Sequence, residues 1–98
     1  MNNILNALGL AQRARALISG ENIVLDAILN KKAKLVLVSN DISDGSLKKI
    51  SDKSRTNEIE LIQIDFDRYD IGKAIGKEFR VCLAVTDKNF VSMIKKKL

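Results

Sequence analysis

One apolar segment near the middle of the chain, residues 33–39, restricts the possible folds more than any other. It reads AKLVLVS, and its apolar run from Leu35 to Val38 has no polar break. A strand with one face in water alternates apolar and polar residues, whereas a strand that is apolar throughout is covered on both faces. The segment therefore predicts a buried strand in the centre of a sheet that has helices on both sides.

Helical and strand patterns alternate along the rest of the chain. The predicted helices cover 4–18, 21–30, 43–56, 67–75 and 87–98, and the predicted strands cover 33–39, 61–64 and 81–85. Strand, helix and strand in succession predict a right-handed parallel crossover. Helices before and between parallel strands, with no proline and no linker, predict an α/β fold. We expect one domain over residues 1–98, a three-layer α/β/α sandwich.

The helix ends carry specific signals. The third helix begins at Ser43 or Ser46, and the last is capped by Thr86 or Asp87. Asp67 is predicted to cap the fourth helix. Gly20 and Gly76 follow predicted helices and are natural helix stops. In the last helix, we expect the apolar stripe to face the core, namely Phe90, Ile94 and Leu98.

The charge of the chain limits its partners. The formal net charge is +5, from 17 Lys and Arg against 12 Asp and Glu. This balance is typical of proteins that bind nucleic acid or anionic membranes, and also of a solvated basic surface. The sequence has no run of eighteen apolar residues and no basic leader before an apolar block. We therefore expect a cytoplasmic protein with no membrane partner.

Side chains for catalysis are scarce. The chain has no His and one Cys, Cys82, whose apolar neighbours Val81 and Leu83 predict a buried small hydrophobic residue. Imidazole-based acid–base catalysis and His-dependent triads are excluded within the chain, and a structural zinc site lacks ligands. The glycine-rich nucleotide motifs are absent. We expect a protein that is not an enzyme and holds no cofactor and no metal.

Three loops combine turn residues with polar or charged side chains. Residues 19–22 open a helix, where backbone N–H groups favour phosphate, or form a simple glycine turn. Residues 39–41 follow a strand's carboxyl end, where ligand sites collect, or form an Asx turn through Asn40. Residues 77–80 place Phe79 beside Arg80, which suits a nucleotide and its phosphate. Alternatively, Phe79 belongs to the core and Arg80 reaches out to water.

Two longer segments overlap two of these three loops and have a recognisable sequence. They read LGLAQRARALISGE near the start and IGKAIGKEFRVCLAVTD near the end. On these segments the chain resembles the small kink-turn RNA-binding ribosomal proteins typified by archaeal L7Ae and eukaryal L30e. More narrowly, it resembles their bacterial YlxQ-like branch. The resemblance covers essentially the whole chain. It implies an α/β/α sandwich around a mixed sheet of about four strands.

The resemblance also implies which residues contact RNA. Family members use a Gly-x-Asn or Gly-x-Lys element at the start of the second helix, a polar residue after the next strand, and the loop before the last strand. The matching positions are Gly20, Glu21, Asn22, Asn40, Phe79, Arg80 and Val81. The resemblance places these three loops at one end of the domain. Lys77 is expected to hold the RNA backbone together with Arg80.

Two positions depart from the family pattern. Many kink-turn binders have Glu directly after the Asn and Lys one helical turn past it, whereas this chain has Ile23 and Asp26. A carboxylate at the second position repels the RNA backbone. We expect basic residues elsewhere to supply the positive charge, namely Arg13, Arg15, Lys31 and Lys32.

The leading hypothesis is a non-enzymatic, cytoplasmic RNA-binding protein that is monomeric and ribosome-associated. It recognises structured, kink-turn-like RNA, with ribosomal RNA as the expected partner. The alternative is a protein-interaction module of the same fold that docks onto the ribosome, a translation factor or the RNA-processing machinery. The changes at Ile23 and Asp26 favour this alternative. An RNA-modifying enzyme is disfavoured, because no constellation activates water or binds a methyl donor.

Overall fold

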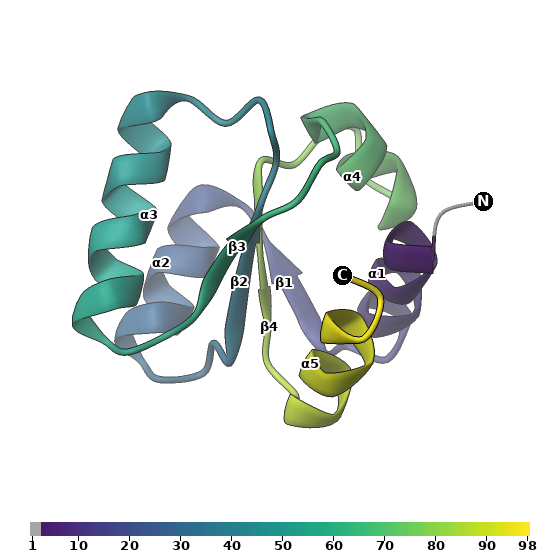
Figure 1. Cartoon of the computed structure of the whole chain (residues 1–98), viewed down its shortest axis with the longest axis horizontal. Helices are drawn as coiled ribbons and strands as arrows, with labels where there is room; N and C mark the ends of the chain where they lie inside the picture. Colours follow the sequence, from purple (N-terminus) through teal and green to yellow (C-terminus); the bar gives the residue numbers. More distant parts are fainter. Residues whose placement is uncertain (1–2) are drawn as a thin grey trace.

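Four short strands form one mixed sheet between two layers of helices (Figure 1). The computed structural model describes residues 3–98. In chain order the elements are α1 (Asn3–Arg13), β1 (Leu17–Ser19), α2 (Glu21–Leu29), β2 (Leu35–Val38), α3 (Asp44–Thr56), β3 (Leu61–Gln63), α4 (Arg68–Ala74), β4 (Cys82–Val85) and α5 (Lys88–Lys95). Helices α2 and α3 cover one face, and α1, α4 and α5 cover the other (Figure 1). The predicted three-layer α/β/α sandwich is confirmed.

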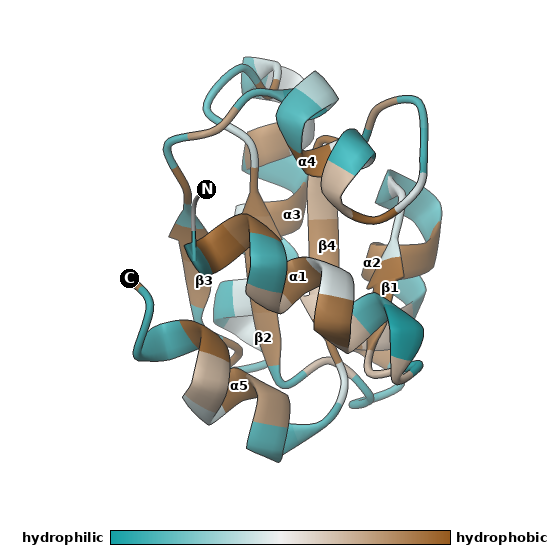
Figure 2. Cartoon of the chain, turned by 90° about the vertical axis from the view of Figure 1, so that its right-hand side faces the viewer, coloured by the Kyte–Doolittle hydropathy of each residue, from teal (hydrophilic) through white to brown (hydrophobic). Residues whose placement is uncertain are grey.

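The central strand β2 accounts for the two-sided core. Leu35 and Leu37 pack with α1, α4 and α5, whereas Val36 and Val38 pack with α2 and α3. All four side chains are fully buried. Figure 2, seen from the side of α1 and α5, shows hydrophobic strands behind these helices. The apolar run therefore predicted the position of this strand correctly, because successive side chains point to opposite faces.

The sheet order is β1-β4-β2-β3, with β2 and β3 parallel as the crossover pattern predicts. The expectation that β4 also runs parallel is wrong, since β4 is antiparallel to both β1 and β2. The connection through α4 explains the difference. This helix has seven residues, and the loop after it returns to the end of the sheet where β3 finishes. Strand β4 therefore starts at that end and runs back, which gives the mixed sheet that the family resemblance implies.

The predicted helix over 4–18 is too long. Helix α1 ends at Arg13, and Arg15 adopts a left-handed conformation with a φ of 59°. The chain then turns and forms the edge strand β1, in which Ile18 pairs with Ala84 of β4. The spacing of apolar residues continued past the turn, but pairing with a buried strand overrides a local helical pattern.

The predicted helix caps are confirmed at three helices. Asp67 accepts hydrogen bonds from the backbone N–H groups of Tyr69 and Asp70, both at 2.9 Å. Ser43 caps α3 and Asp87 caps α5. The expectation for Leu98 is wrong: Ile94 is buried, but Leu98 lies beyond the end of α5 and is 54% exposed. Within residues 3–98, no helix is long and apolar enough to span a bilayer.

Candidate nucleic-acid interface

The structure brings the three polar loops together at one end of the sheet, the upper end in Figure 1. The N–H of Gly20, just after β1, donates to the carbonyl oxygen of Cys82 at 3.2 Å. The N–H of Ser39, just after β2, donates to the carbonyl oxygen of Val81 at 2.9 Å. The beginning of β4 therefore lies between the other two loops, and each is tied to it by a backbone hydrogen bond.

The loop before β4 is held against α4 by a Schellman motif. Gly76 has a φ of 75°, which an amino acid with a side chain adopts at a cost. The N–H of Lys77 donates to the carbonyl oxygen of Gly72 at 2.8 Å, and the N–H of Gly76 donates to that of Lys73 at 3.4 Å. The returning chain then passes directly over Gly72. A Cβ atom at this glycine would lie 2.6 Å from the Cα of Phe79, so the helix and the loop are in backbone contact.

Arg80 is fixed by three hydrogen bonds and is half-buried. Its Nε donates to Ser19 Oγ at 2.9 Å, and its Nη1 donates to the carbonyl oxygen of Phe79 at 2.7 Å. Its backbone N–H donates to the carbonyl oxygen of Arg68 at 3.0 Å. Its Nη2 has no partner among residues 3–98. The guanidinium is thus pre-oriented beside the start of α2 and keeps N–H groups free for an acceptor such as a phosphate oxygen.

A concavity of about 240 Å³ lies next to Arg80. It combines apolar side chains with the cationic side chains of Lys77 and Arg80, and it is lined by Gln12, Leu17, Ile18, Ser19, Ile23, Lys77 and Arg80. Elements α1, β1, the start of α2 and the loop before β4 all contribute to it. An apolar surface bordered by cations suits a base or sugar whose phosphate lies at the border.

The start of α2 presents free backbone donors to this region. Gly20 is the N-cap, with a φ of 104°, and no side chain caps the helix. The first N–H groups of a helix have no partner within the helix, and the helix dipole favours an anion there. Asn22 is exposed in the first turn. The open donors at this helix start suit the phosphate site considered from the sequence.

Glu21, at the start of α2, faces the neighbouring helix α3 of the same layer rather than the concavity. Lys49 Nζ donates to Glu21 Oε2 at 3.3 Å. The Ser46 hydroxyl and the Lys49 ammonium group hold the pKa of Glu21 below its usual value. The carboxylate is thereby kept charged and partly neutralised by its neighbour. Glu21 belongs to the Gly-x-Asn element by sequence, but its side chain stabilises the α2–α3 contact.

The loop after β2 is held by the loop after β3. Asn40 Nδ2 donates to Asp65 Oδ1 at 3.1 Å, and the N–H of Asn40 donates to the carbonyl oxygen of Phe66 at 2.9 Å. The side chain of Asn40 is thus bonded to another loop and does not form the Asx turn considered from the sequence. Asn40 is exposed and reaches the same end of the sheet as Arg80.

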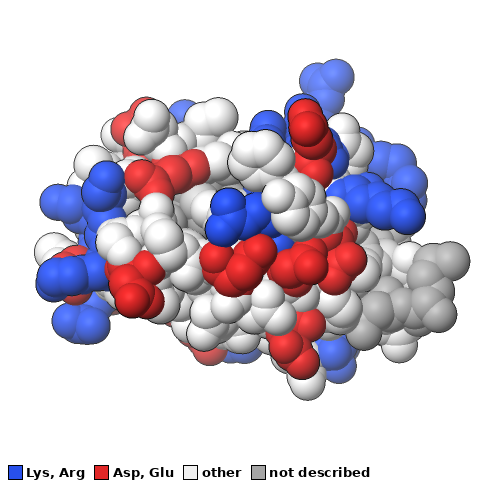
Figure 3. Space-filling model, turned by 90° about the horizontal axis from the view of Figure 1, so that it is seen from above, with Lys and Arg blue, Asp and Glu red and all other residues white. Residues whose placement is uncertain are grey.

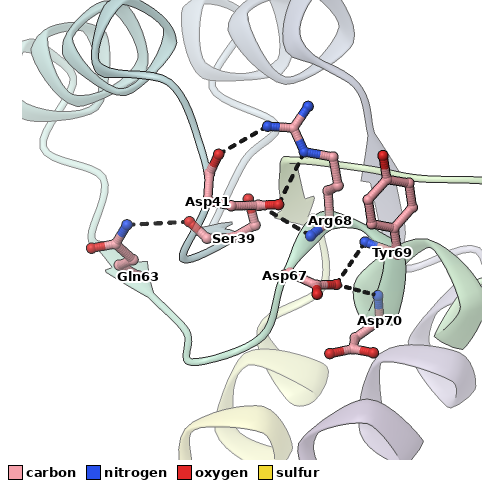
Figure 4. Close-up of polar contacts among 7 residues, drawn as sticks. All are labelled: Ser39, Asp41, Gln63, Asp67, Arg68, Tyr69 and Asp70. Carbon is pink, nitrogen blue, oxygen red and sulfur yellow. Dashed lines mark hydrogen bonds and ion pairs between the residues drawn. The ribbon is translucent and has the colours of Figure 1, made fainter.

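Asp41 joins this loop to α4 (Figure 4). Its carboxylate accepts hydrogen bonds from the backbone N–H and the Nε of Arg68, at 3.0 and 3.1 Å. Arg68 Nη2 also donates to the carbonyl oxygen of Asp41 at 2.9 Å. The Ser39 hydroxyl and the Arg68 guanidinium lower the pKa of the Asp41 carboxyl group. The Ser39 hydroxyl forms no hydrogen bond of standard geometry within residues 3–98, so it lowers this pKa as a nearby dipole.

The charges at this end are divided between its middle and its flanks. Figure 3 shows the view onto it, with carboxylates across the middle and most Lys and Arg side chains at the two sides. The loops after β2 and β3 carry Asp41, Asp65 and Asp67, whereas the loop before β4 carries Lys77 and Arg80. An anionic ligand is therefore attracted to the side that holds the concavity.

Phe79 and Tyr69 are the exposed aromatic residues of the described chain. Phe79 is 46% exposed, so the alternative that it belongs to the core is wrong. Its ring meets that of Tyr69 in an edge-on arrangement, with centroids 6.2 Å apart. Sequence reasoning missed Tyr69 and Arg68. A signal existed for Tyr69, because Ile71 and Ile75 define the buried side of α4 and place Tyr69 away from it.

Two predicted site residues differ from the others in position. Lys32 follows α2 at the other end of the sheet, where the N–H of Lys34 bonds to the carbonyl oxygen of Val85, the last residue of β4. It lines a second concavity of about 270 Å³ that also contains Asp26. Val81 is half-buried and contributes its backbone carbonyl to the contact with Ser39. The structure therefore brings the three predicted loops together, whereas Lys32 lies at the other end of the sheet.

Cys82 is fully buried at the start of β4. Burial raises the pKa of its thiol to about 12. The thiol is neutral at physiological pH and is not a nucleophile, as the apolar neighbours in the sequence predict. Across residues 3–98, His, Cys, Asp and Glu side chains do not gather in groups of three that could hold a metal ion.

Comparison with known proteins places this geometry in a family. The sequence model of the ribosomal protein L7Ae/L30e/S12e/Gadd45 family matches residues 2–95. RNA-binding protein YlxQ of Bacillus subtilis (strain 168) is 42% identical over 87 residues, which cover 89% of this chain and 86% of that protein. Large ribosomal subunit protein eL30 of Oryza sativa subsp. japonica is 32% identical over 95 residues, 96% of this chain and 86% of that protein.

Solved structures show the same fold. A Bacillus halodurans protein described as having unknown function superimposes with a TM-score of 0.92 at 35% identity, covering 99% of this chain and 97% of that one. The Giardia lamblia 15.5kD RNA binding protein superimposes with a TM-score of 0.81 at 15% identity, covering 97% of this chain and 81% of that one. The second likeness is one of fold alone.

Proposed function

Because the chain belongs to the ribosomal protein L7Ae/L30e/S12e/Gadd45 family, as its sequence predicted, we propose that it is a non-enzymatic protein that binds structured RNA of the kink-turn type. We further propose that it acts as a monomer in the cytoplasm, in association with the ribosome, and that ribosomal RNA is its partner. The names of its relatives support this proposal, since they are an RNA-binding protein and a ribosomal subunit protein.

One observation carries the proposal. Ser19 and Ile23, on either side of the uncapped helix start at Gly20, line one concavity with the pre-oriented guanidinium of Arg80, about sixty residues later in the sequence. In our proposal, the N–H groups after Gly20 and the cations Lys77 and Arg80 bind phosphates. Asn22 and Asn40 hydrogen-bond base or sugar edges, and Phe79 packs on an unstacked nucleotide.

A gel-shift or calorimetric titration tests this function. The wild-type protein is titrated with a kink-turn RNA and with the same RNA after disruption of its tandem sheared G·A pairs. We expect tighter binding to the intact RNA, and a slope of log affinity against log salt of about −3 to −4 if about four phosphates are neutralised. Binding of neither RNA at low salt would rule out the proposal, and equal binding of both would rule out kink-turn recognition.

Two substitutions connect the binding to the site. Asn22→Ala and Arg80→Ala should weaken the affinity for the intact RNA without changing the circular dichroism spectrum. Asn22 is exposed and has no side-chain hydrogen bond within residues 3–98, so its replacement leaves the fold intact. Asn3→Ala, at the first residue of α1, is a matched control that should bind as the wild type does. Unchanged affinity in both site variants would contradict the assignment.

A second candidate function, docking of a protein from the translation or RNA-processing machinery, has one observation in its favour. A concavity of about 480 Å³ lies between α1 and α4, outside the loops described above. Leu5 and Ala74 line it together with Arg13 and Lys73. Asn6→Arg would obstruct this concavity and leave RNA binding unchanged. Pull-down of a ribosomal or translation factor by the wild type, and its loss in this variant, would support the second function.

A further inference from the structure

Two aromatic side chains project from the end of the domain that carries the candidate interface. Tyr69 is 62% exposed and Phe79 is 46% exposed. The other two aromatic residues, Phe66 and Phe90, are partly buried against the core. Exposure of two neighbouring rings costs hydrophobic stabilisation that burial would provide. A place on the surface where both rings stay in water therefore calls for an explanation.

The backbone fixes the position of both rings. Asp67 caps α4 through the N–H groups of Tyr69 and Asp70, which sets the first turn of the helix and the direction of Tyr69. Gly72, one turn later, allows the loop before β4 to lie on the helix, with the Phe79 backbone against it. The hydrogen bond from the N–H of Arg80 to the carbonyl oxygen of Arg68 closes the arrangement at 3.0 Å. The fold thus fixes the two backbone positions from which the rings project.

The geometry of the pair leaves aromatic surface open. The ring planes are inclined at 64°, so the edge of one ring meets the face of the other. In such an arrangement, the ring that contributes its edge keeps both faces free of its partner. Bases stack on exposed aromatic faces whatever their sequence, because every base has a π surface.

We propose that Tyr69 and Phe79 form a stacking platform for an unpaired nucleobase of the RNA, next to the part of the RNA held by Gly20 and Arg80. This inference rests on the proposed function and adds Tyr69 to it as a binding residue. The ligand is a nucleobase that is not paired within the RNA, as found in loops, bulges and ends.

The charges around the platform are consistent with this ligand. Arg68 Nε and Nη2 are already engaged by Asp41, and the Asp67 carboxylate, which repels a phosphate, accepts hydrogen bonds from backbone N–H groups (Figure 4). Lys73 lies one helical turn from Tyr69, at position i+4 on α4. Asp70 and Glu78, which adjoin the two aromatic residues in the sequence, are also exposed. An uncharged base therefore suits the platform better than a phosphate does, and Lys73 and Lys77 are the cations near it.

The composition of the chain offers a direct spectroscopic test. Tyr69 is the one tyrosine, and there is no tryptophan, so the tyrosine emission reports on Tyr69 alone. Kink-turn RNA with unpaired purines should quench this emission in proportion to occupancy. A Tyr69→Phe, Leu98→Tyr variant is the control, because Leu98 is exposed beyond α5 and its replacement reports only absorption of light by the RNA. Quenching that is equal in the two proteins would overturn the inference.

Affinity measurements provide the second test. Tyr69→Ala should weaken binding about tenfold, whereas Tyr69→Phe keeps the ring and should bind as the wild type does. The RNA is also prepared with an abasic nucleotide at each unpaired position in turn. At the stacked position, removal of the base should weaken binding to the wild-type protein about tenfold. The Tyr69→Ala variant should bind this abasic RNA and the intact RNA with equal affinity.

The outcomes separate this inference from the proposed function. If wild type binds kink-turn RNA and Arg80→Ala weakens it, but Tyr69→Ala has full affinity with every RNA, the platform is wrong and the function stands. If wild type binds no structured RNA at low salt, both are wrong. If the losses of affinity caused by Tyr69→Ala and by one abasic position do not add when combined, the result would support the platform and identify the stacked base.

Discussion

Arg68 and Asp41 form a three-bond contact between the loop after β2 and the start of α4 (Figure 4). The backbone N–H and Nε of Arg68 donate to the Asp41 carboxylate, and Arg68 Nη2 donates to the carbonyl oxygen of Asp41. The carbonyl oxygen of Arg68 in turn accepts from the N–H of Arg80. Arg68, the first residue of α4, thus links the loop after β2 to the loop before β4.

Replacement of Asp41 by Asn should make the stability of the fold less sensitive to pH in the acidic range. The pKa of Asp41 is lowered from its ordinary value of 3.8 in the folded protein. Its contribution is therefore fully present above that value and is lost as the pH falls through the folded pKa. Asp41→Asn should lower the melting temperature at pH 7, and the difference from wild type should shrink toward zero in acid. Thermal unfolding followed by circular dichroism at a series of pH values measures it.

Asp26→Asn is the matched control for this acid dependence. Asp26 is exposed on α2 and forms no ion pair within residues 3–98. Its replacement should leave the melting temperature close to that of wild type at pH 7. If Asp41→Asn and Asp26→Asn behaved alike at every pH, the contact between Asp41 and Arg68 would make no contribution to stability.

Gly72→Ala should destabilise the fold and displace the loop before β4. The new Cβ would lie 2.6 Å from the Cα and 2.8 Å from the N of Phe79, and neither backbone atom can move without shifting the loop. Overpacking of this kind costs about 1–3 kcal/mol, which lowers the melting temperature of a domain of this size by roughly 4–8 °C per kcal/mol. RNA affinity should fall as well, because Phe79 and Arg80 move with the backbone.

Gly45→Ala provides the comparison within the same chain. Gly45 lies in the first turn of α3 and has no atom within 4 Å of an added Cβ. Alanine in a helix is more stable than glycine by roughly 0.5–1 kcal/mol, so this variant should melt at the same or a higher temperature. A Gly72→Ala protein that is as stable as Gly45→Ala and binds RNA fully would show that the backbone contact is dispensable.

The parts of the fold that followed from the sequence are those in which local pattern and tertiary contact agree. The run from Leu35 to Val38 indicates a strand buried on both faces, and both core clusters use it. Asp67 caps a helix by sequence and in the structure. Strand β1 escaped prediction because its residues continue the helical spacing of α1. Its three residues become a strand only through their pairing with β4, a contact across more than sixty positions.

The site was predictable where a resemblance mapped single positions and not where contacts determine the geometry. Gly20, Asn22 and Arg80 were found, although only the structure shows that Ser19 orients Arg80. For Tyr69, the pattern of α4 shows only that the side chain lies away from the buried side, and its neighbour Phe79 lies in another segment of the sequence. Lys32 was included for its charge alone, and charge gives no information on which end of the sheet a residue occupies.

Cys82 should resist thiol reagents in the folded protein. The side chain is fully buried and its pKa is raised from 9.0 to about 12. Reaction with a chromogenic disulfide reagent at pH 8 should therefore be as slow as unfolding, and fast in denaturant. The unfolded state loses the thiol proton above pH 9.0, whereas the folded state keeps it, so stability should fall between pH 9 and 12. Rapid labelling of the native protein would contradict the burial of Cys82. In the Cys82→Ala variant, stability should fall less between pH 9 and 12 than it does in the wild type.

Lys77→Ala and Lys32→Ala should differ in the salt dependence of RNA binding. Lys77 borders the concavity beside Arg80, whereas Lys32 lies at the other end of the sheet, with the carboxylate of Asp26 between it and Asn22 along α2. Loss of one phosphate contact reduces the slope of log affinity against log salt by roughly 1. We expect this change for Lys77→Ala and a slope near that of wild type for Lys32→Ala. Equal slopes in the two variants would mean that the RNA extends along the whole of α2.

Asp26→Lys should strengthen RNA binding. Asp26 is exposed one helical turn past Asn22, so its carboxylate repels the phosphates that the start of α2 attracts. Lysine at this position restores the residue found in many kink-turn binders and should raise affinity about two- to fivefold at low salt, with a steeper salt slope. Glu58→Lys makes the same charge change at an exposed residue after α3, at the other end of the sheet. It should have a smaller effect, and equal gains in both variants would mean that net charge, not the position beside Asn22, determines affinity.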